Sequence, residues 1–279
     1  MVETQFSAGA VQLSALDNQG QGPIVLGIHG FLDNAESLNV LAPFLTSYHF
    51  IALDLAGHGR SSHRPEGAHY NQADYLQDLF ALITEQGWDD VILVGHSLGG
   101  ILATMFAALF PEKVRGVVSI DACGPLVEPE ESTQEQMRNA ILSRHGKTTS
   151  ASRAIDLDEM VKMRCKVTDM SASDARIILQ RSVKQNGEGQ DVWSSDSRLR
   201  TKSVLRLTEK QSENLMRAIE CPLLFIGASN SFKQLGTVFP RRAQWFKNVQ
   251  YEQLVGGHHI HMENTEDVGR LIRQFVEQL

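Results

Sequence analysis

The chain has 279 residues, 42% of them hydrophobic and 21% charged, which is ordinary for a soluble globular protein with one large core. Its 26 basic and 33 acidic residues give a net charge of −7, which argues against nucleic acid as a partner. Three scattered cysteines, the lack of a signal-peptide pattern and the lack of an apolar stretch near ~18 residues lead us to expect a cytoplasmic protein without a membrane partner.

Short apolar runs alternate with helix-favouring intervals along most of the chain. In chain order, we predict one or two antiparallel edge strands at 4–17 and buried strands at 24–28, 50–53, 91–94 and 114–120. Two more strands are predicted at 223–226 and 249–254. The predicted helices lie at 35–45, 71–86, 98–109 and 265–279. Strands and helices that alternate in this way form right-handed crossovers, so the pattern predicts an α/β fold with a mostly parallel, doubly wound sheet.

The interval 124–219 interrupts this alternation and carries apolar residues at helical spacing instead. Two candidate capping boxes support further helices within it. These pairs are Ser171 with Asp174 and Thr208 with Gln211. We therefore expect a helical cap at 124–219, inserted into a core domain formed by 1–123 and 220–279.

The pentapeptide Gly95-His96-Ser97-Leu98-Gly99 follows the predicted strand 91–94 and opens the predicted helix 98–109. A G-x-S-x-G sequence in this context is typical of a serine nucleophile on a sharp strand-to-helix turn. The two glycines suit the crowded backbone of such a turn, and Ser97 then stands clear of the sheet. The alternative is a glycine-rich turn with an incidental serine.

A serine hydroxyl is a poor nucleophile at neutral pH and needs a base within hydrogen-bond reach. His258 follows the last predicted strand after two glycines, and catalytic groups of such folds gather beyond the carboxyl ends of the strands. We therefore predict His258 as the base, with His259 and His261 as alternative bases and a structural role as the alternative for His258. A metal site built on these three histidines lacks a fourth ligand, so we expect no metal.

An oxyanion hole requires backbone N–H groups beside the nucleophile. Leu98, the residue after the nucleophile, is one expected donor, and Phe31 in the loop after strand 24–28 is the other. Gly30 lets this loop approach the site closely, whereas His29 is expected to brace the loop, with a catalytic role as the alternative. The residues expected to contact the substrate are Gly30, His96 and Trp193.

Four motifs in chain order resemble those of the α/β-hydrolase fold superfamily. They are His29-Gly30-Phe31-Leu32-Asp33-Asn34, Asp54-Leu55-Ala56-Gly57-His58-Gly59-Arg60-Ser61, Gly95-His96-Ser97-Leu98-Gly99-Gly100 and Gly257-His258-x3-Met262-Glu263. The resemblance spans nearly the whole chain, and the first motif together with the segment 193–199 is most similar to the serine hydrolase-like group. It implies an α/β-hydrolase fold with an inserted helical cap, and structural roles for Asp54 and His58.

The acid of the expected triad is taken from this resemblance. In many members of the superfamily it follows the strand equivalent to 223–226, but here that turn reads Gly227-Ala228-Ser229-Asn230, and no Asp or Glu occurs from 221 to 251. Some members instead place the acid after the strand that follows the nucleophile helix, which implies Asp121 here. The alternatives are Asp121 as a turn cap and Asn230 as a neutral residue that holds the tautomer of the base.

We therefore expect a serine hydrolase that cleaves a carboxylic ester or thioester of a small molecule through an acyl-enzyme, with no metal or organic cofactor. The triad would be Ser97 as nucleophile, His258 as base and Asp121 as acid. The alternatives are hydrolysis of C–C bonds or amides on the same triad, and a non-catalytic ligand-binding or signalling protein. The basic run at 198–206 either holds an anionic acyl group or forms a solvated face of the cap. The sequence leaves the oligomeric state open.

Overall fold

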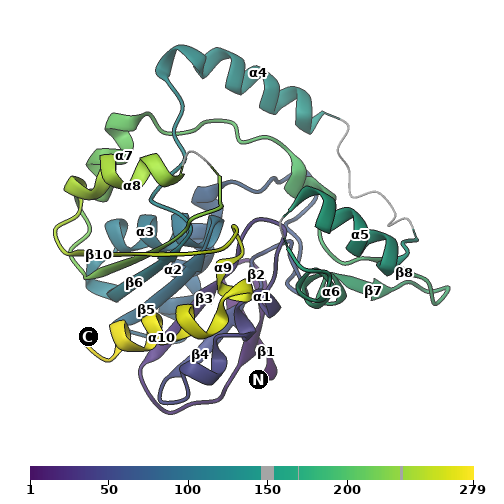
Figure 1. Ribbon diagram of the computed structural model, residues 1–279. Helices are drawn as coiled ribbons and strands as arrows, with labels where there is room; N and C mark the ends of the chain where they lie inside the picture. The colour runs from purple at the N-terminus through teal and green to yellow at the C-terminus, as the bar shows by residue number, and fades with distance from the viewer. Residues whose placement is uncertain (146–153, 169, 233–234) are drawn as a thin grey trace.

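The computed structural model describes residues 1–145, 154–168, 170–232 and 235–279. Its core is an eight-stranded sheet in the order β1-β2-β4-β3-β5-β6-β9-β10 (Figure 1). The strands are β1 (Val2–Ala8), β2 (Val11–Asp17), β3 (Ile24–Ile28), β4 (His49–Leu53), β5 (Val91–His96), β6 (Val114–Ile120), β9 (Leu223–Ala228) and β10 (Val249–Leu254). The β1–β2 and β2–β4 pairs are antiparallel and the other neighbouring pairs are parallel, which confirms the predicted sheet.

Helices lie on both faces of this sheet and in the segment 124–219. They are α1 (Glu36–Asn39), α2 (Gln72–Glu85), α3 (Leu98–Leu109), α4 (Thr133–Arg144), α5 (Leu157–Val167), α6 (Ala172–Arg181), α7 (Glu209–Met216), α8 (Leu235–Arg242), α9 (Ile260–Glu263) and α10 (Thr265–Val276). Short 3₁₀ turns lie at 42–44, 111–113, 130–132, 197–200 and 243–245. Within the described ranges, none of these helices is both long and apolar enough to cross a membrane.

Alternate residues of the central strands pack against opposite layers of helices, as the two-residue period of a strand requires. In β5, Leu93 packs in one core together with residues of α2 and α3, whereas Val94 packs in a second core with residues of α10. Both side chains are fully buried. The strand is therefore apolar on both faces, which explains why it forms a continuous apolar run in the sequence.

The helix predicted at 35–45 is wrong. The structure has only the single turn α1 and the 3₁₀ turn at 42–44 in this interval. Pro43 has no backbone N–H to donate, and its ring would clash with a carbonyl of the preceding helical turn, so a regular helix does not continue through it. Helix α10 also ends earlier than predicted, at Val276.

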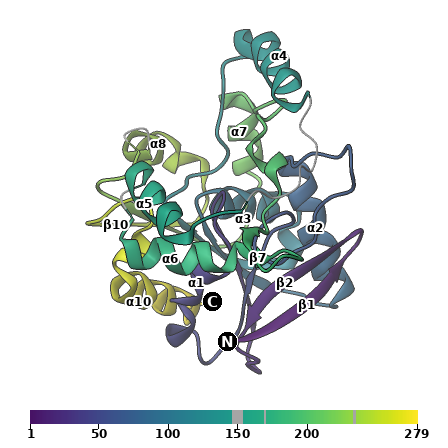
Figure 2. The ribbon, with the colours of Figure 1, turned by 90° about the vertical axis from the view of Figure 1, so that its right-hand side faces the viewer.

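Residues 124–219 add no strand to the eight-stranded sheet in the ranges described and instead carry α4 to α7. Figures 1 and 2 show α4 standing away from the sheet, with α5 and α6 packed side by side. Of the two predicted capping boxes, Thr208–Gln211 is complete, whereas Ser171 caps its helix without the reciprocal bond from Asp174. The Ser171 side chain accepts from the N–H of Asp174, and Thr208 and Gln211 bond reciprocally.

The segment 124–219, for which the sequence predicts helices, also contains strands. Two short strands, β7 (Val183–Gln185) and β8 (Asp191–Trp193), form an antiparallel hairpin. A turn at 186–189 joins them, and the N–H of Asn186 donates to the carbonyl of Gln190 at 2.9 Å. Strands of three residues are too short to produce a recognisable alternation of apolar and polar residues.

Candidate active site

Ser97 lies at the turn between β5 and α3, with φ of +51° and ψ of −113°. A positive φ is strained for a residue with a side chain, and such strain concentrates at functional sites. The Ser97 N–H donates to the carbonyl of Ile120 in β6 at 2.9 Å, which anchors the turn to the neighbouring strand. Ser97 is therefore held half-buried beyond the carboxyl end of β5, where the sequence predicts a nucleophile.

Two glycines allow this turn to form. A Cβ on Gly99 would lie 1.8 Å from the carbonyl oxygen of Ile28, and a Cβ on Gly95 would lie 2.2 Å from the carbonyl oxygen of Gly99. Both oxygens are backbone atoms, so they cannot move aside without displacing β3 or α3. The helix and the sheet therefore approach each other too closely here for any residue but glycine.

Gly99→Ala is expected to lower the free energy of unfolding by ~3 kcal/mol or more, because the added methyl overlaps a backbone oxygen in a packed core. Urea unfolding of this variant measures the loss. Gly187→Ala is the matched control, because the Cβ position of Gly187 has open space around it. Equal unfolding midpoints for the two variants would contradict the prediction.

Asp121 and His258 share a direct hydrogen bond, with 2.6 Å between Asp121 Oδ2 and His258 Nδ1. Asp121 follows β6 directly, is 4% exposed and has a φ of +50°. Its other oxygen accepts from the N–H of Ala228 at 3.1 Å. Because an ionised carboxylate only accepts hydrogen bonds, Nδ1 of His258 carries a proton and Nε2 is left to accept one.

The loop after β9 contributes a contact that the sequence analysis missed. The Ser231 hydroxyl donates to Asp121 Oδ2 and lies 3.4 Å from His258 Nδ1. Phe232 packs edge-on against the His258 ring, with 4.7 Å between the ring centroids. Asn230 is exposed, and its side-chain oxygen accepts from the hydroxyl of the preceding serine. A hydroxyl in a loop carries no sequence pattern, so a search for carboxylates could not find Ser231.

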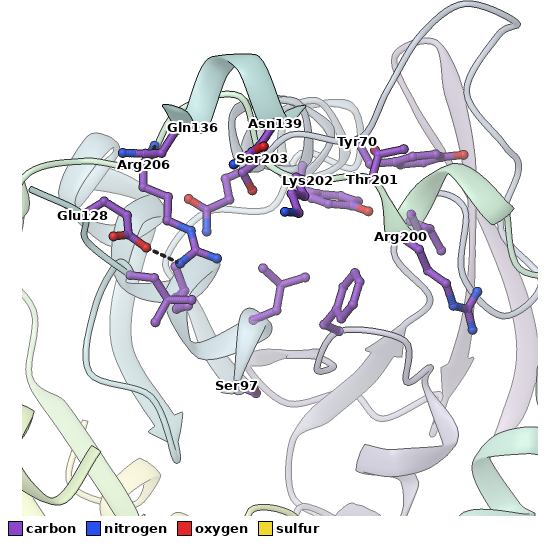
Figure 3. A pocket seen from close by; sticks show the side chains of 17 residues that line it. Tyr70, Ser97, Glu128, Gln136, Asn139, Arg200, Thr201, Lys202, Ser203 and Arg206 are labelled. Atoms are coloured by element: carbon purple, nitrogen blue, oxygen red, sulfur yellow. Dashed lines mark hydrogen bonds and ion pairs between the residues drawn. The ribbon is translucent and has the colours of Figure 1, made fainter. Parts of the chain in front are cut away.

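Ser97 lies at the junction of two cavities. The first, of about 560 Å³ (Figure 3), is also lined by Phe31 and Leu98, and the second, of about 550 Å³, by Asp121 and His258.

In the described parts of the chain, His258 forms hydrogen bonds through its Nδ1 and through its backbone carbonyl. None of these bonds joins His258 to the Ser97 hydroxyl. Catalytic hydrogen bonds of this kind often tighten only when substrate binds. The site can therefore receive a carbonyl group at Ser97 with one substituent in each cavity.

The loop after β3 brings Phe31 to the first cavity. The N–H of Asp33 donates to the carbonyl of Gly30 at 3.1 Å, which closes a tight turn around Phe31. Leu98 is the first residue of α3, so its N–H has no partner inside the helix and belongs to the positive end of the helix dipole. Phe31 and Leu98 thus border the same cavity as Ser97, as donors of an oxyanion hole must.

His29 is completely buried behind this loop. Its Nδ1 donates to the carbonyl of Gly30 at 2.7 Å, and its Nε2 accepts from the N–H of Leu55 at 3.0 Å. Burial lowers the pKa of His29 to about 4, so the ring is neutral at pH 7. These contacts make His29 a brace for the loop rather than a group that reaches substrate.

The three residues expected to contact substrate are not among those that line the two cavities. Gly30 packs against His96, whose Nδ1 would lie 2.8 Å from a Cβ on Gly30. His96 is completely buried, and its Nε2 donates to the carbonyl of His258 at 2.9 Å. Trp193 packs against the apolar cluster of α5 and α6 and is not among the residues that line either cavity. Gly30 and His96 therefore support the site from behind, and Trp193 belongs to the core of the inserted segment.

A buried cluster of Asp33, His96 and His259 lies behind the site. Their potential ligand atoms lie within 4.8 Å of one another, which raises the question of a metal ion. Asp33 already accepts from Arg164 and, at 3.1 Å, from His259 Nε2. Burial opposes the charge of Asp33, but the hydrogen bond from His259 and the charge of Arg164 hold its pKa well below the usual range. Hydrogen bonds and an ion pair therefore account for this cluster, and we assign no metal to it.

Two further buried carboxylates hold the surrounding loops through arginines. Asp54 accepts from the N–H groups of Ala35 and Arg60 and from the guanidinium of Arg181. Asp196 pairs with Arg198 at 2.7 Å. Arg198 is 2% exposed and also donates to the carbonyls of Arg64, Pro65 and Ala68. Arg198 is therefore structural, although its neighbours in the basic run remain candidates for binding.

Because several histidines are buried and neutral, we expect the free energy of unfolding to fall in mild acid. Burial lowers the pKa of His29 and His96 to about 4 and that of His58 to about 3, whereas the unfolded chain binds these protons near pH ~6.5. As the pH falls below ~6.5, the unfolded state gains protons that the folded state does not bind, so stability falls toward pH ~4. Burial raises the pKa of Asp78 to about 6, so this group stabilises the folded state as the pH falls. It is one group against three histidines.

Urea unfolding across this pH range tests the effect. We expect the midpoint to fall steadily from neutral pH to about pH 5, and to fall less steeply in His58→Asn, which has one buried imidazole fewer. Circular dichroism at each pH, with refolding on return to neutral pH, separates reversible unfolding from aggregation. A midpoint that stays constant or rises as the pH falls would refute the proton-linkage argument.

The chain is similar to known proteins in both sequence and structure. A family model described as the alpha/beta hydrolase fold matches residues 23–265. A serine hydrolase-like protein of Danio rerio is 30% identical over 268 residues, covering 92% of this chain and 82% of the relative. A hypothetical protein of Pseudomonas aeruginosa PAO1 has a TM-score of 0.89 at 30% identity, covering 99% of this chain and 100% of the other. A thioesterase domain from the curacin biosynthetic pathway has a TM-score of 0.84 at 25% identity, with 98% of each chain covered.

Proposed function

The chain is a hydrolase of the α/β hydrolase fold family, and from this premise we propose that Ser97 attacks carboxylic esters or thioesters and forms an acyl-enzyme. One observation carries the proposal. Ser97, on a strained strand-to-helix turn, borders the same cavity as an Asp121–His258 pair joined at 2.6 Å. A serine, an imidazole and a buried carboxylate are the groups that activate a hydroxyl for attack on a carbonyl. The likeness to a thioesterase domain supports including thioesters among the substrates.

In the proposed first step, Ser97 Oγ attacks the carbonyl carbon of the substrate while Nε2 of His258 takes its proton. Asp121 accepts the hydrogen bond from Nδ1 and stabilises the imidazolium that results. The N–H groups of Phe31 and Leu98 donate to the oxyanion of the tetrahedral intermediate. Collapse of this intermediate breaks the bond to the alcohol or thiol, which leaves with the proton from His258.

Water completes the reaction in the second step. His258 takes a proton from a water molecule, whose oxygen attacks the carbonyl carbon of the acyl-enzyme. The second intermediate expels Ser97 Oγ, which regains a proton from His258, and the acyl group leaves as a carboxylic acid. Both steps pass through the same oxyanion, so the same two N–H groups serve each of them.

We assign substrate recognition to the inserted segment and propose that 124–219 is a cap over a core of 1–123 and 220–279. Side chains from this segment line both cavities at Ser97, among them Leu126, Glu128 and Arg206. A cap in this place limits the access of water to the reacting carbonyl and selects the groups that fit beside it.

Labelling with a fluorophosphonate tests this function, because such a probe bonds to an activated serine. We expect one adduct per chain, on the peptide that contains Ser97, and none in Ser97→Ala. A panel of p-nitrophenyl esters, acyl thioesters, anilides and diketones then identifies the class of bond that is cleaved. The absence of an adduct at Ser97 would overturn the enzyme proposal. An adduct with turnover of amides or diketones alone would overturn the ester and thioester assignment.

A further inference from the structure

Both cavities are lined by positive side chains, several of which a carboxylate neutralises. Arg206, which borders both cavities, pairs with Glu128 at 3.2 Å. Arg241 and Arg242, which border the second cavity, pair with Glu209 at 3.2 and 2.9 Å. Each of these three arginines therefore has a carboxylate within ion-pair distance, although Arg241 and Arg242 share one.

Arg200 and Lys202 in the first cavity differ from these residues. Neither pairs with a carboxylate anywhere in the part of the chain that the structure describes. Both are exposed at the rim of the cavity, so a ligand can reach them. The pKa of Arg200 is lowered, first because protein atoms partly shield its guanidinium from water and then by the nearby charge of Arg164. An anion at this position would relieve that unfavourable environment.

The backbone that carries these two cations is held in place from both sides. The 3₁₀ turn Ser197–Arg200 contains the buried Arg198, which is tied to Asp196. The N–H of Lys202 donates to the hydroxyl of Ser143 in α4 at 2.9 Å. The backbone that carries both cations is therefore anchored at the rim of the cavity before any ligand binds, and the exposed side chains can turn toward an anion there.

We propose that the first cavity binds the acyl group of the substrate and that this group ends in a carboxylate held by Arg200 and Lys202. The inference rests on the proposed hydrolysis at Ser97 and names its substrate class as half-esters or half-thioesters of dicarboxylic acids. A carboxylate paired with a guanidinium and an ammonium group forms charge-assisted hydrogen bonds, which are stronger than neutral ones.

The positions of base and oxyanion donors assign the acyl group to this cavity. The leaving group must take its proton from His258, which lines the second cavity, so the alcohol or thiol occupies that side. Phe31 and Leu98 line the first cavity. The remaining substituent of the carbonyl carbon, the acyl chain, therefore extends into the first cavity.

The lining of the first cavity also fits a chain with a charged end. Phe31, Leu98 and Ile101 provide apolar surface. Figure 3 shows Ser97 at one side of the cavity and Lys202 at the opposite side. An acyl chain with methylene groups beside the carbonyl and a carboxylate at its far end matches this order of surfaces.

Three substrates with equal acyl length test the inference. They are p-nitrophenyl pentanoate, which is neutral, p-nitrophenyl hydrogen glutarate, whose acyl end is charged, and pentanoyl coenzyme A, whose leaving group is charged. We expect the double variant R200Q/K202Q to lower kcat/KM for the glutarate half-ester by about 10- to 100-fold. Hydrolysis of the pentanoate ester and of the thioester should change by less than about twofold.

A matched control separates a local contact from a general loss of charge. The variant K184Q/R273Q removes the same number of positive charges from exposed positions on β7 and α10, which line neither cavity. We expect it to hydrolyse all three substrates as the wild type does. Arg200→Lys, which keeps the charge, should retain most of the preference for the glutarate half-ester.

The outcomes distinguish this inference from the proposed function. Hydrolysis of the neutral ester with no preference for the glutarate half-ester would overturn the inference alone. A defect of the double variant confined to pentanoyl coenzyme A would also overturn it, because the anion would then belong to the leaving group. A wild-type protein that hydrolyses none of the three and is not labelled at Ser97 would overturn the proposed function, and the inference with it.

Discussion

Ser97→Ala is expected to lower kcat/KM for ester hydrolysis by about 10⁴- to 10⁶-fold while leaving the fold intact. The variant keeps the Asp121–His258 pair and the N–H groups of Phe31 and Leu98. It lacks the hydroxyl that attacks the carbonyl, so no acyl-enzyme can form. Only the slow attack of water, aided by the oxyanion donors, remains.

Initial rates on p-nitrophenyl esters, beside urea unfolding, measure this loss. Ser47→Ala is a suitable control because Ser47 is an exposed serine in the turn before β4. It should match the wild type in both rate and stability. If Ser97→Ala retained a tenth or more of the wild-type rate, another residue would have to be the nucleophile.

Asp121→Asn is expected to lower kcat by about 10³- to 10⁴-fold with a smaller effect on KM. The amide cannot balance an imidazolium, and its NH₂ group favours the tautomer of His258 that carries its proton on Nε2. That nitrogen then has no lone pair with which to accept the proton of Ser97. The effect therefore falls on the chemical step rather than on substrate binding.

Variants of the neighbouring loop complete this experiment. Asn230→Ala should remain within about twofold of the wild type, because Asn230 is exposed and bonds to the adjacent serine rather than to His258. Ser231→Ala should lower kcat by about tenfold, since Asp121 loses a hydrogen bond of roughly 1.4 kcal/mol. Full activity of Asp121→Asn together with loss of activity in Asn230→Ala would reverse the assignment of the acid.

The parallel sheet could be predicted because its strands are buried on both faces. The continuous apolar run at 91–94 is typical of a strand buried on both faces. The predicted helix at 35–45 is wrong because Pro43 interrupts it. The β7–β8 hairpin was missed because each strand has only three residues.

The site could be predicted only in part, for a related reason. Ser97, Asp121 and His258 each follow a strand, so topology alone brings them to one edge of the sheet. Side-chain placement depends on contacts between distant segments and leaves no local pattern. For that reason the sequence did not indicate that His96 and Trp193 are removed from the cavities.

The buried ring of His96 links the loop 29–34 to the loop that carries His258. It donates to the carbonyl of His258, and its other nitrogen lies 3.5 Å from Asp33. His259 bonds to the same carboxylate. We therefore expect changes to the loop 29–34 to displace His258 as well. Substitutions in 29–34 and in 256–261 should combine non-additively, so the two loops are best randomised together in a single library.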